Sequence, residues 1–145
     1  MVSRKTQQLN IEYYTTKEIK LSGTSLKEIE DHAVQIFTSI KKRTKRTPYI
    51  RSKYFNKEKV FLNIFWQHLY QKREKDRVRR LKFFNCAIEL IKNSIKNPQT
   101  TENFKQKKEL LYRFYGCTRN KDKFIVQIKE NKRTKRKDLI SIYPE

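Results

Sequence analysis

LLYRFYGCTRNKDKFIVQIKENKRTKRKDLISIYPE, residues 110–145, is the stretch that decides the fold. It covers most of three runs rich in β-branched and aromatic residues, at 109–118, 123–131 and 138–145. The two connections between them, RNKD and KRTKRK, are short and turn-like or strongly polar. Short connections favour antiparallel neighbours, so this stretch predicts a three-stranded antiparallel meander.

Three helices are expected before the meander. The first covers about 25–42, where apolar residues recur at helical spacing behind a Ser-x-x-Glu capping box. Apolar residues on one face predict a second helix over 57–72. The third covers about 75–96 and is closed by Pro98 and a polar loop.

Short strands are expected at two further places, residues 9–21 and around Tyr49–Arg51. The predicted fold is therefore α+β: N-terminal strand(s) and a helix, and two further helices packed on a C-terminal antiparallel sheet of three to four strands. The length of 145 residues fits a single domain, 1–145. It divides into a neutral strand-helix segment, 1–45, and a basic core, 46–145.

The charge points to a polyanionic partner. The formal net charge is +21 at pH 7, and the first 40 residues hold as many acidic as basic side chains, so the excess lies beyond them. Nucleic acid is the expected partner, because cations placed on phosphates release condensed counterions. No apolar run approaches the roughly 20 residues of a membrane span. Without a visible signal peptide, and with two cysteines read as reduced thiols, the expected location is the cytoplasm.

The cations expected to bind nucleic acid fall into three groups. On an ideal helix, Arg73, Arg77 and Arg80 form one stripe, with Arg79 and Lys82 on neighbouring rows. The other two groups lie in the connector after the first helix and in the last turn of the meander: Arg43, Lys45, Arg46 and Arg51; Lys132, Arg133 and Arg136.

Alternation along the meander predicts an open sheet face that can bind RNA. Side chains of a strand point alternately to its two faces. If Phe124, Val126 and Ile128 face the helices, the opposite face presents a polar set that could hold phosphates and stack bases. This set is Arg113, Gln127, Lys129, Ser141 and Tyr143, while Ile140 and Ile142 are expected to point inward.

Metal or cofactor chemistry is not expected. The two histidines and two cysteines match no zinc spacing, and two glycines cannot build a phosphate loop. Asp122 followed by Gln127 and Lys129 is only weakly similar to the carboxylate and lysine motif of magnesium-dependent nucleases, because one acid alone lies nearby. Metal-independent RNA cleavage needs instead a base for the 2′-hydroxyl, an acid for the leaving oxygen and cations for the phosphate. This chain is rich in such residue types.

His68 has two interpretations. It falls on the apolar side of the second predicted helix, one turn after Ile64, where a buried and hydrogen-bonded histidine is the favoured expectation. The alternative is a catalytic histidine beside the arginine stripe.

Residues 57–145 resemble the group of ribonuclease folds that includes barnase, EndoU, colicin E5/D and RelE (BECR). The ending Ser141, Ile142, Tyr143 and Pro144 is similar to that of its phage- and plasmid-borne branch. The resemblance implies a metal-independent endoribonuclease, often a toxin. The catalytic candidates that it implies are His68, Arg113, Lys129, Ser141 and Tyr143. This chain departs from the group in having no histidine in the meander.

The function expected from the sequence is therefore that of an RNA-directed basic protein, a metal-independent endoribonuclease acting by 2′-hydroxyl attack. The alternative is a non-catalytic nucleic-acid-binding accessory of a plasmid or mobile element. A weaker alternative is a metal-dependent DNA nuclease. RNA is the favoured partner over DNA, an acidic inhibitor or antitoxin protein is kept open, and no membrane partner is expected.

Overall fold

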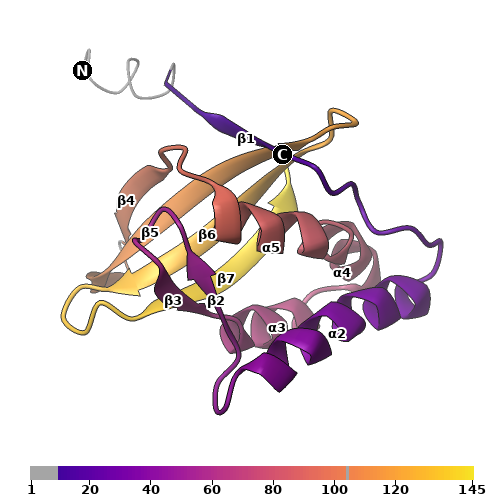
Figure 1. Ribbon diagram of the computed structural model, residues 1–145, viewed down its shortest axis with the longest axis horizontal. Helices are drawn as coiled ribbons and strands as arrows, with labels where there is room; N and C mark the ends of the chain where they lie inside the picture. The colour runs from indigo at the N-terminus through magenta and orange to yellow at the C-terminus, as the bar shows by residue number, and fades with distance from the viewer. Residues whose placement is uncertain (1–9, 104) are drawn as a thin grey trace.

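The centre of the molecule is a strongly curled mixed sheet (Figure 1). A computed structural model describes residues 10–103 and 105–145, apart from the side chains at 103, 106 and 107. These described residues form seven strands in the order β1-β5-β6-β7-β3-β2, with β4 and β1 sharing the same edge of β5. The strands are β1 (Tyr13–Thr16), β2 (Tyr49–Ser52), β3 (Glu58–Phe61), β4 (Gln99–Asn103), β5 (Gln106–Thr118), β6 (Lys123–Asn131) and β7 (Lys137–Pro144).

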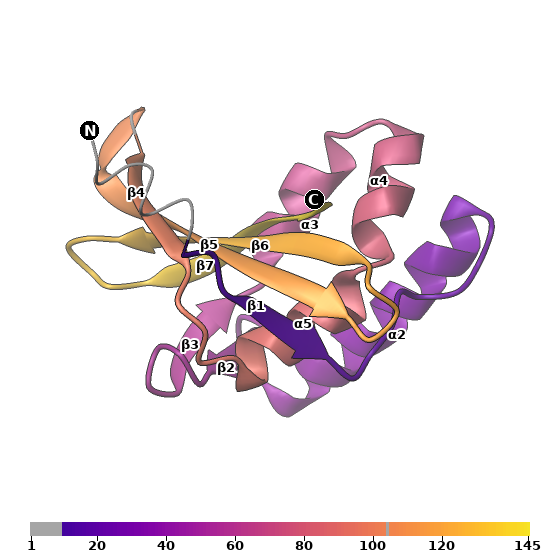
Figure 2. The same ribbon diagram turned by 90° about the horizontal axis from the view of Figure 1, so that it is seen from above.

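Four helices accompany the sheet in the described part of the chain: α2 (Leu26–Arg43), α3 (Asn63–Tyr70), α4 (Glu74–Leu81) and α5 (Phe84–Asn93). α5 lies on one side of the sheet, while α3 and α4 run along the β7 edge and extend to the other side (Figure 2). α2 packs against α4, α5 and β2. As the capping box predicts, the Ser25 hydroxyl accepts a hydrogen bond from the Glu28 amide at 3.2 Å.

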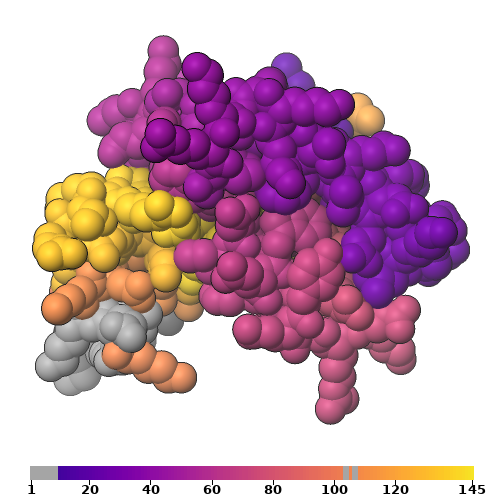
Figure 3. Space-filling view, turned by 90° about the horizontal axis from the view of Figure 1, so that it is seen from below, coloured from indigo at the N-terminus to yellow at the C-terminus, as the bar shows by residue number. Residues whose placement is uncertain are grey.

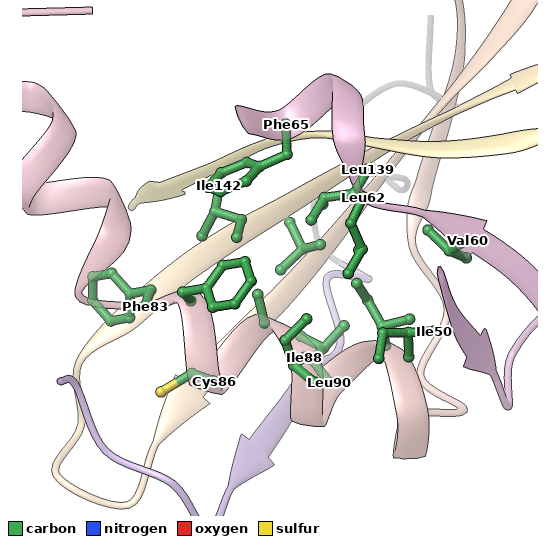
Figure 4. Close-up of a cluster of buried hydrophobic side chains, with 14 of the residues drawn as sticks. Ile50, Val60, Leu62, Phe65, Phe83, Cys86, Ile88, Leu90, Leu139 and Ile142 are labelled. Carbon is green, nitrogen blue, oxygen red and sulfur yellow. The ribbon is translucent and has the colours of Figure 1, made fainter. Parts of the chain in front are cut away.

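The hydrophobic core lies between the helices and one sheet face (Figure 4). Phe124, Val126 and Ile128 of β6 are buried in it, as alternation predicts. The rings of Phe65 from α3 and Phe84 from α5 stack with their centroids 5.7 Å apart, so the two helices are joined across the core.

The predicted sheet was wrong in size and in direction. We expected three to four antiparallel strands with two further helices packed on them, and the described residues form a seven-stranded mixed sheet with four helices. The meander β5-β6-β7 is antiparallel, but β1 and β3 join its two edges in parallel. These pairings join segments far apart in the chain, so no local pattern reveals them.

Two predicted helices were also different. The expected helix over 57–72 begins with strand β3, because Val60 and Phe61 pair with β7, and only 63–70 is helical. The expected helix over 75–96 is broken at Phe83, whose amide bonds to the Arg80 carbonyl in a tight turn. The break turns the chain, so that α4 follows the β7 edge while α5 covers the core.

A β-bulge changes the last strand. Gln127 pairs with Ser141, but the next residue, Ile128, pairs with Leu139, so β7 carries one extra residue at this point. As a result Leu139 and Ile142 are fully buried, whereas Ile140 lies outside the core. The prediction that Ile140 points inward was therefore wrong. Ser141 and Tyr143 still share the face opposite to the core, as expected.

Candidate nucleic-acid interface

The sheet face opposite to the core carries a row of aromatic side chains. Strand register aligns Tyr13, Tyr115, Ile125 and Tyr143 across β1, β5, β6 and β7, and we call these four residues the tyrosine row. The rings of Tyr13 and Tyr115 meet edge to face at 5.7 Å. Tyr115 and Ile125 are buried, while Tyr13 and Tyr143 are half-buried and keep ring surface accessible. These two tyrosines can therefore stack on bases.

A polar row lies beside the tyrosine row. Gln99, Arg113, Gln127 and Ser141 are aligned across β4, β5, β6 and β7, and we call them the arginine row. Three of these residues are in the open-face set predicted from alternation. Lys129, from the same set, lies two residues further along β6, opposite Leu111 and Asp138. The structure thus brings all the predicted open-face residues onto one face.

Arg80 connects α4 to this face. Its Nη1 donates to the Ser141 hydroxyl oxygen at 2.9 Å, and its guanidinium lies 5.5 Å from the centre of the Tyr143 ring. Asp76, one helical turn earlier, lies 3.2 Å from Arg80 Nε and steadies the side chain. A guanidinium held in this way still has N–H groups that can donate to a phosphate.

His68 is exposed, so the expectation of a buried histidine was wrong. The helix α3 buries Phe65, Trp66 and Leu69, which leaves His68 at the border of its apolar side. His68 Nδ1 lies 3.2 Å from the Ile140 carbonyl oxygen, at the bulge of β7. A carbonyl oxygen only accepts, so Nδ1 must donate. In the neutral ring Nε2 is then a free acceptor, the form that a general base requires.

The phenol of Tyr143 sits among charges of the same site. Burial is the largest influence and raises the pKa of Tyr143 above its usual value. The positive charges of Arg113 and Arg80 act in the opposite direction and the nearby Tyr115 acts in the same direction as burial, so the pKa remains raised. Tyr143 therefore stays protonated at neutral pH and can donate a hydrogen bond or a proton.

The cations predicted on α4 lie in different surroundings. Arg80 reaches β7, but Arg79 and Lys82 line a separate pocket with the β5–β6 turn. Arg73 is exposed at the N-cap of α4, and Arg77 is half-buried on the same helix. Helical geometry alone could not tell which of these cations meets the sheet.

The remaining predicted cations lie elsewhere on the surface. Arg51 packs on the Tyr49 ring of its own strand, and Arg136 packs on Phe61 and contacts Asp138 at 3.3 Å. Lys132 pairs with Glu102 at 2.7 Å. Four others are exposed, at the end of α2, just after it and in the β6–β7 turn: Arg43, Lys45, Arg46 and Arg133.

Sequence reasoning missed Tyr13 and three lysines near it, Lys20, Lys121 and Lys123. Tyr13 joins the tyrosine row through the parallel pairing of β1 with β5, which has no local signal. The lysines meet at one pocket although Lys20 is distant in the sequence from Lys121 and Lys123.

The site has the shape of an open trough rather than a closed cavity. Seen from below, the outline of the molecule is indented between the pink side chains of α3–α4 and the yellow and orange side chains of the strands (Figure 3). Such a surface fits an extended strand better than a small enclosed molecule.

Two general properties of the described residues bear on the site. Within residues 10–103 and 105–145, no three His, Cys, Asp or Glu side chains lie together as a metal ion would require. None of the helices in those ranges has the length and apolar character that crossing a membrane requires.

Comparison of the chain with protein-family models, with curated proteins and with solved structures finds no match. The resemblance to the BECR ribonucleases therefore stays a prediction, and the functional argument rests on the residues of this chain.

Proposed function

We propose that this protein is an RNA-directed endoribonuclease that works without a metal ion and holds RNA on the open sheet face beside α3 and α4. One observation carries the proposal. His68 bonds to the Ile140 carbonyl and Arg80 to the Ser141 hydroxyl, so an imidazole and a guanidinium are both held at consecutive residues of β7. A base and a cation at one point are the minimum that 2′-hydroxyl attack needs.

The reaction assigns one task to each group. His68 Nε2 takes the proton of the 2′-hydroxyl, and the 2′-oxygen attacks the adjacent phosphorus. Arg80 and Arg113 balance the extra negative charge on the phosphate oxygens. The bond from phosphorus to the 5′-oxygen breaks, and the Tyr143 hydroxyl gives that oxygen its proton. The products are a 2′,3′-cyclic phosphate and a 5′-hydroxyl, and His68 and Tyr143 then exchange protons with water.

Lys129 is the other candidate for the base, and its surroundings make it the weaker one. Its ammonium faces the Glu109 carboxylate at 3.3 Å. An amine held in an ion pair is already engaged and is less available to a substrate hydroxyl. We therefore assign Lys129 to phosphate attraction and the base to His68.

The test is incubation of labelled RNA, and of DNA of the same sequence, with wild type and His68→Ala in excess EDTA. We expect RNA scission by wild type, none of the DNA, and a loss of about 10²–10⁴-fold in rate for the variant. A matched control is His32→Ala, at a half-buried histidine on α2. Absence of RNA scission, or scission that EDTA abolishes, would overturn the proposal.

A second function, RNA binding without cleavage, is favoured by the tyrosine row. Tyr13 and Tyr143 offer stacking surfaces that need no reactive group, and the positive charge would attract the phosphates. An accessory RNA-binding protein of a plasmid or mobile element would use the same face. Salt-dependent RNA binding without scission would select this function.

The proposed RNA substrate fits a location in the cytoplasm. An acidic inhibitor protein would fit the same face, because it would compete with phosphates for Arg80 and Arg113.

A further inference from the structure

A basic pocket lies next to the open sheet face but outside the proposed reaction site. Its volume is about 440 Å³, and it is formed where the loop after β1, the end of α4, the β5–β6 turn and the end of β7 meet. Five cations line it: Lys20, Arg79, Lys82, Lys121 and Lys123.

The charge of this pocket is largely unbalanced. Its five cations face two carboxylates, Asp122, which pairs with Lys20 at 3.5 Å, and Glu145, which accepts from the Tyr13 hydroxyl at 2.7 Å, so positive charge remains in excess. Among the described residues, no ion pair to a carboxylate is formed by the other four cations, Arg79, Lys82, Lys121 and Lys123. Cations that outnumber the nearby carboxylates repel one another, unless an anion lies between them.

The pocket is continuous with the tyrosine row. Lys123 lines the pocket, and its Nζ also lies 4.9 Å from the centre of the Tyr13 ring. Pro144, another wall residue, directly follows Tyr143. A strand with bases on Tyr13 and Tyr143 therefore has its next phosphates beside this pocket.

We propose that this pocket is a phosphate subsite that binds the backbone of the RNA strand flanking the bases stacked on the tyrosine row. This inference rests on the proposed RNA-binding function. Arg79 and Lys82 reach the pocket from α4 while Arg80 of the same helix reaches Ser141, so α4 contacts the RNA on two sides.

The experiment measures binding of a fluorescein-labelled 2′-O-methyl decauridylate, which lacks the attacking hydroxyl, across a series of salt concentrations. The pocket variant is Arg79→Gln with Lys121→Gln, two exposed cations. The control, Lys53→Gln with Lys57→Gln on the β2–β3 connection, removes the same charge. Lys57 also has the same positive-φ backbone conformation as Lys121, since the two φ angles are 67° and 71°.

We expect the pocket variant to bind about tenfold more weakly near physiological salt. The slope of log K against log salt should become shallower by about 0.7 for each phosphate that the variant no longer binds. The control is expected to stay within about twofold of wild type. Equal slopes and affinities for pocket and control variants, with wild type still binding, would overturn the subsite alone. A wild type that does not bind the oligonucleotide would overturn the RNA-binding function and the subsite with it.

Discussion

At the scale of single residues, the site depends on how two side chains are held at β7. His68 Nδ1 is tied to the Ile140 carbonyl, and Arg80 is tied to Ser141 and to Asp76. Each group thus has a defined orientation before any substrate arrives. Preorganised donors cost no reorganisation during reaction, which is why they stabilise a transition state better than mobile ones.

Arg80→Lys tests the guanidinium fork. Lysine keeps the charge but cannot reach Ser141, Asp76 and a phosphate at once. We expect RNA cleavage to fall by about 10²-fold, with RNA binding changed far less. Arg119→Lys, at an exposed arginine of the β5–β6 turn, is the control and should cleave like wild type. Equal cleavage rates for the two variants would contradict the role of Arg80.

Tyr143 is expected to have two separable roles. Tyr143→Phe keeps the ring but removes the hydroxyl, so RNA binding should remain while cleavage falls. Tyr143→Ala should lose both, with a binding loss of about 1–3 kcal/mol for one stacked base. Fluorescence anisotropy and single-turnover cleavage measure the two effects. A Phe variant that cleaves like wild type would rule out the Tyr143 hydroxyl as the acid.

At the scale of elements, local patterns predicted some features and long-range contacts decided the others. Alternation in β5 and β6 correctly placed Arg113, Gln127 and Lys129 on the open face, because the two-residue period is a local property. The parallel pairing of β1 and β3 was not predictable, because it depends on contacts distant in the chain. The exposure of His68 was missed for the same reason, since β7 decides which side of α3 is covered.

Gly116 leaves room for the ring of Phe124 on the neighbouring strand. It is paired with Phe124, and a Cβ at this position would overlap the Phe124 ring. Phe124 cannot move away easily, because it is fully buried and stacks on Phe83 at 5.0 Å. We expect Gly116→Ala to lower the free energy of unfolding by about 1–3 kcal/mol in urea titrations. Cys117→Ala, its half-buried neighbour, serves as control and should cost less.

The attachment of β1 to α5 should weaken at alkaline pH. The Tyr14 hydroxyl donates to the Glu89 carboxylate at 2.8 Å, and burial together with this bond raises the pKa of Tyr14 to about 12. Between pH 10 and 12, Tyr14 therefore ionises in the unfolded chain but not in the folded one.

A proton that is bound in the folded state but not in the unfolded state makes stability fall as pH rises. The free energy of unfolding should therefore decrease between pH 10 and 12, and ionisation of Tyr14 should have no effect on it below this range. Urea titrations of Tyr14→Phe should show a shallower decrease than wild type. An identical decrease in both proteins would contradict the assignment.

At the scale of the whole molecule, the fold concentrates recognition on one side of the sheet. The helix α5 covers the core face, which leaves the opposite face open beside α3 and α4 (Figure 2). The net charge of +21 is spread more widely than the site, because several cations lie around the β2–β3 and β6–β7 connections. Such a field attracts RNA from a distance, while the tyrosine and arginine rows decide where it is held.

The most direct test of this account is to map where RNA lies. An RNA carrying 4-thiouridine can be photo-crosslinked to the protein and the attached residues identified by mass spectrometry. We predict crosslinks at Tyr13 and Tyr143 and in the adjoining segments of α3 and α4, with none on the outer surface of α2. Crosslinks confined to α2 or to the β2–β3 connection would contradict the assignment of the open sheet face as the RNA-binding surface.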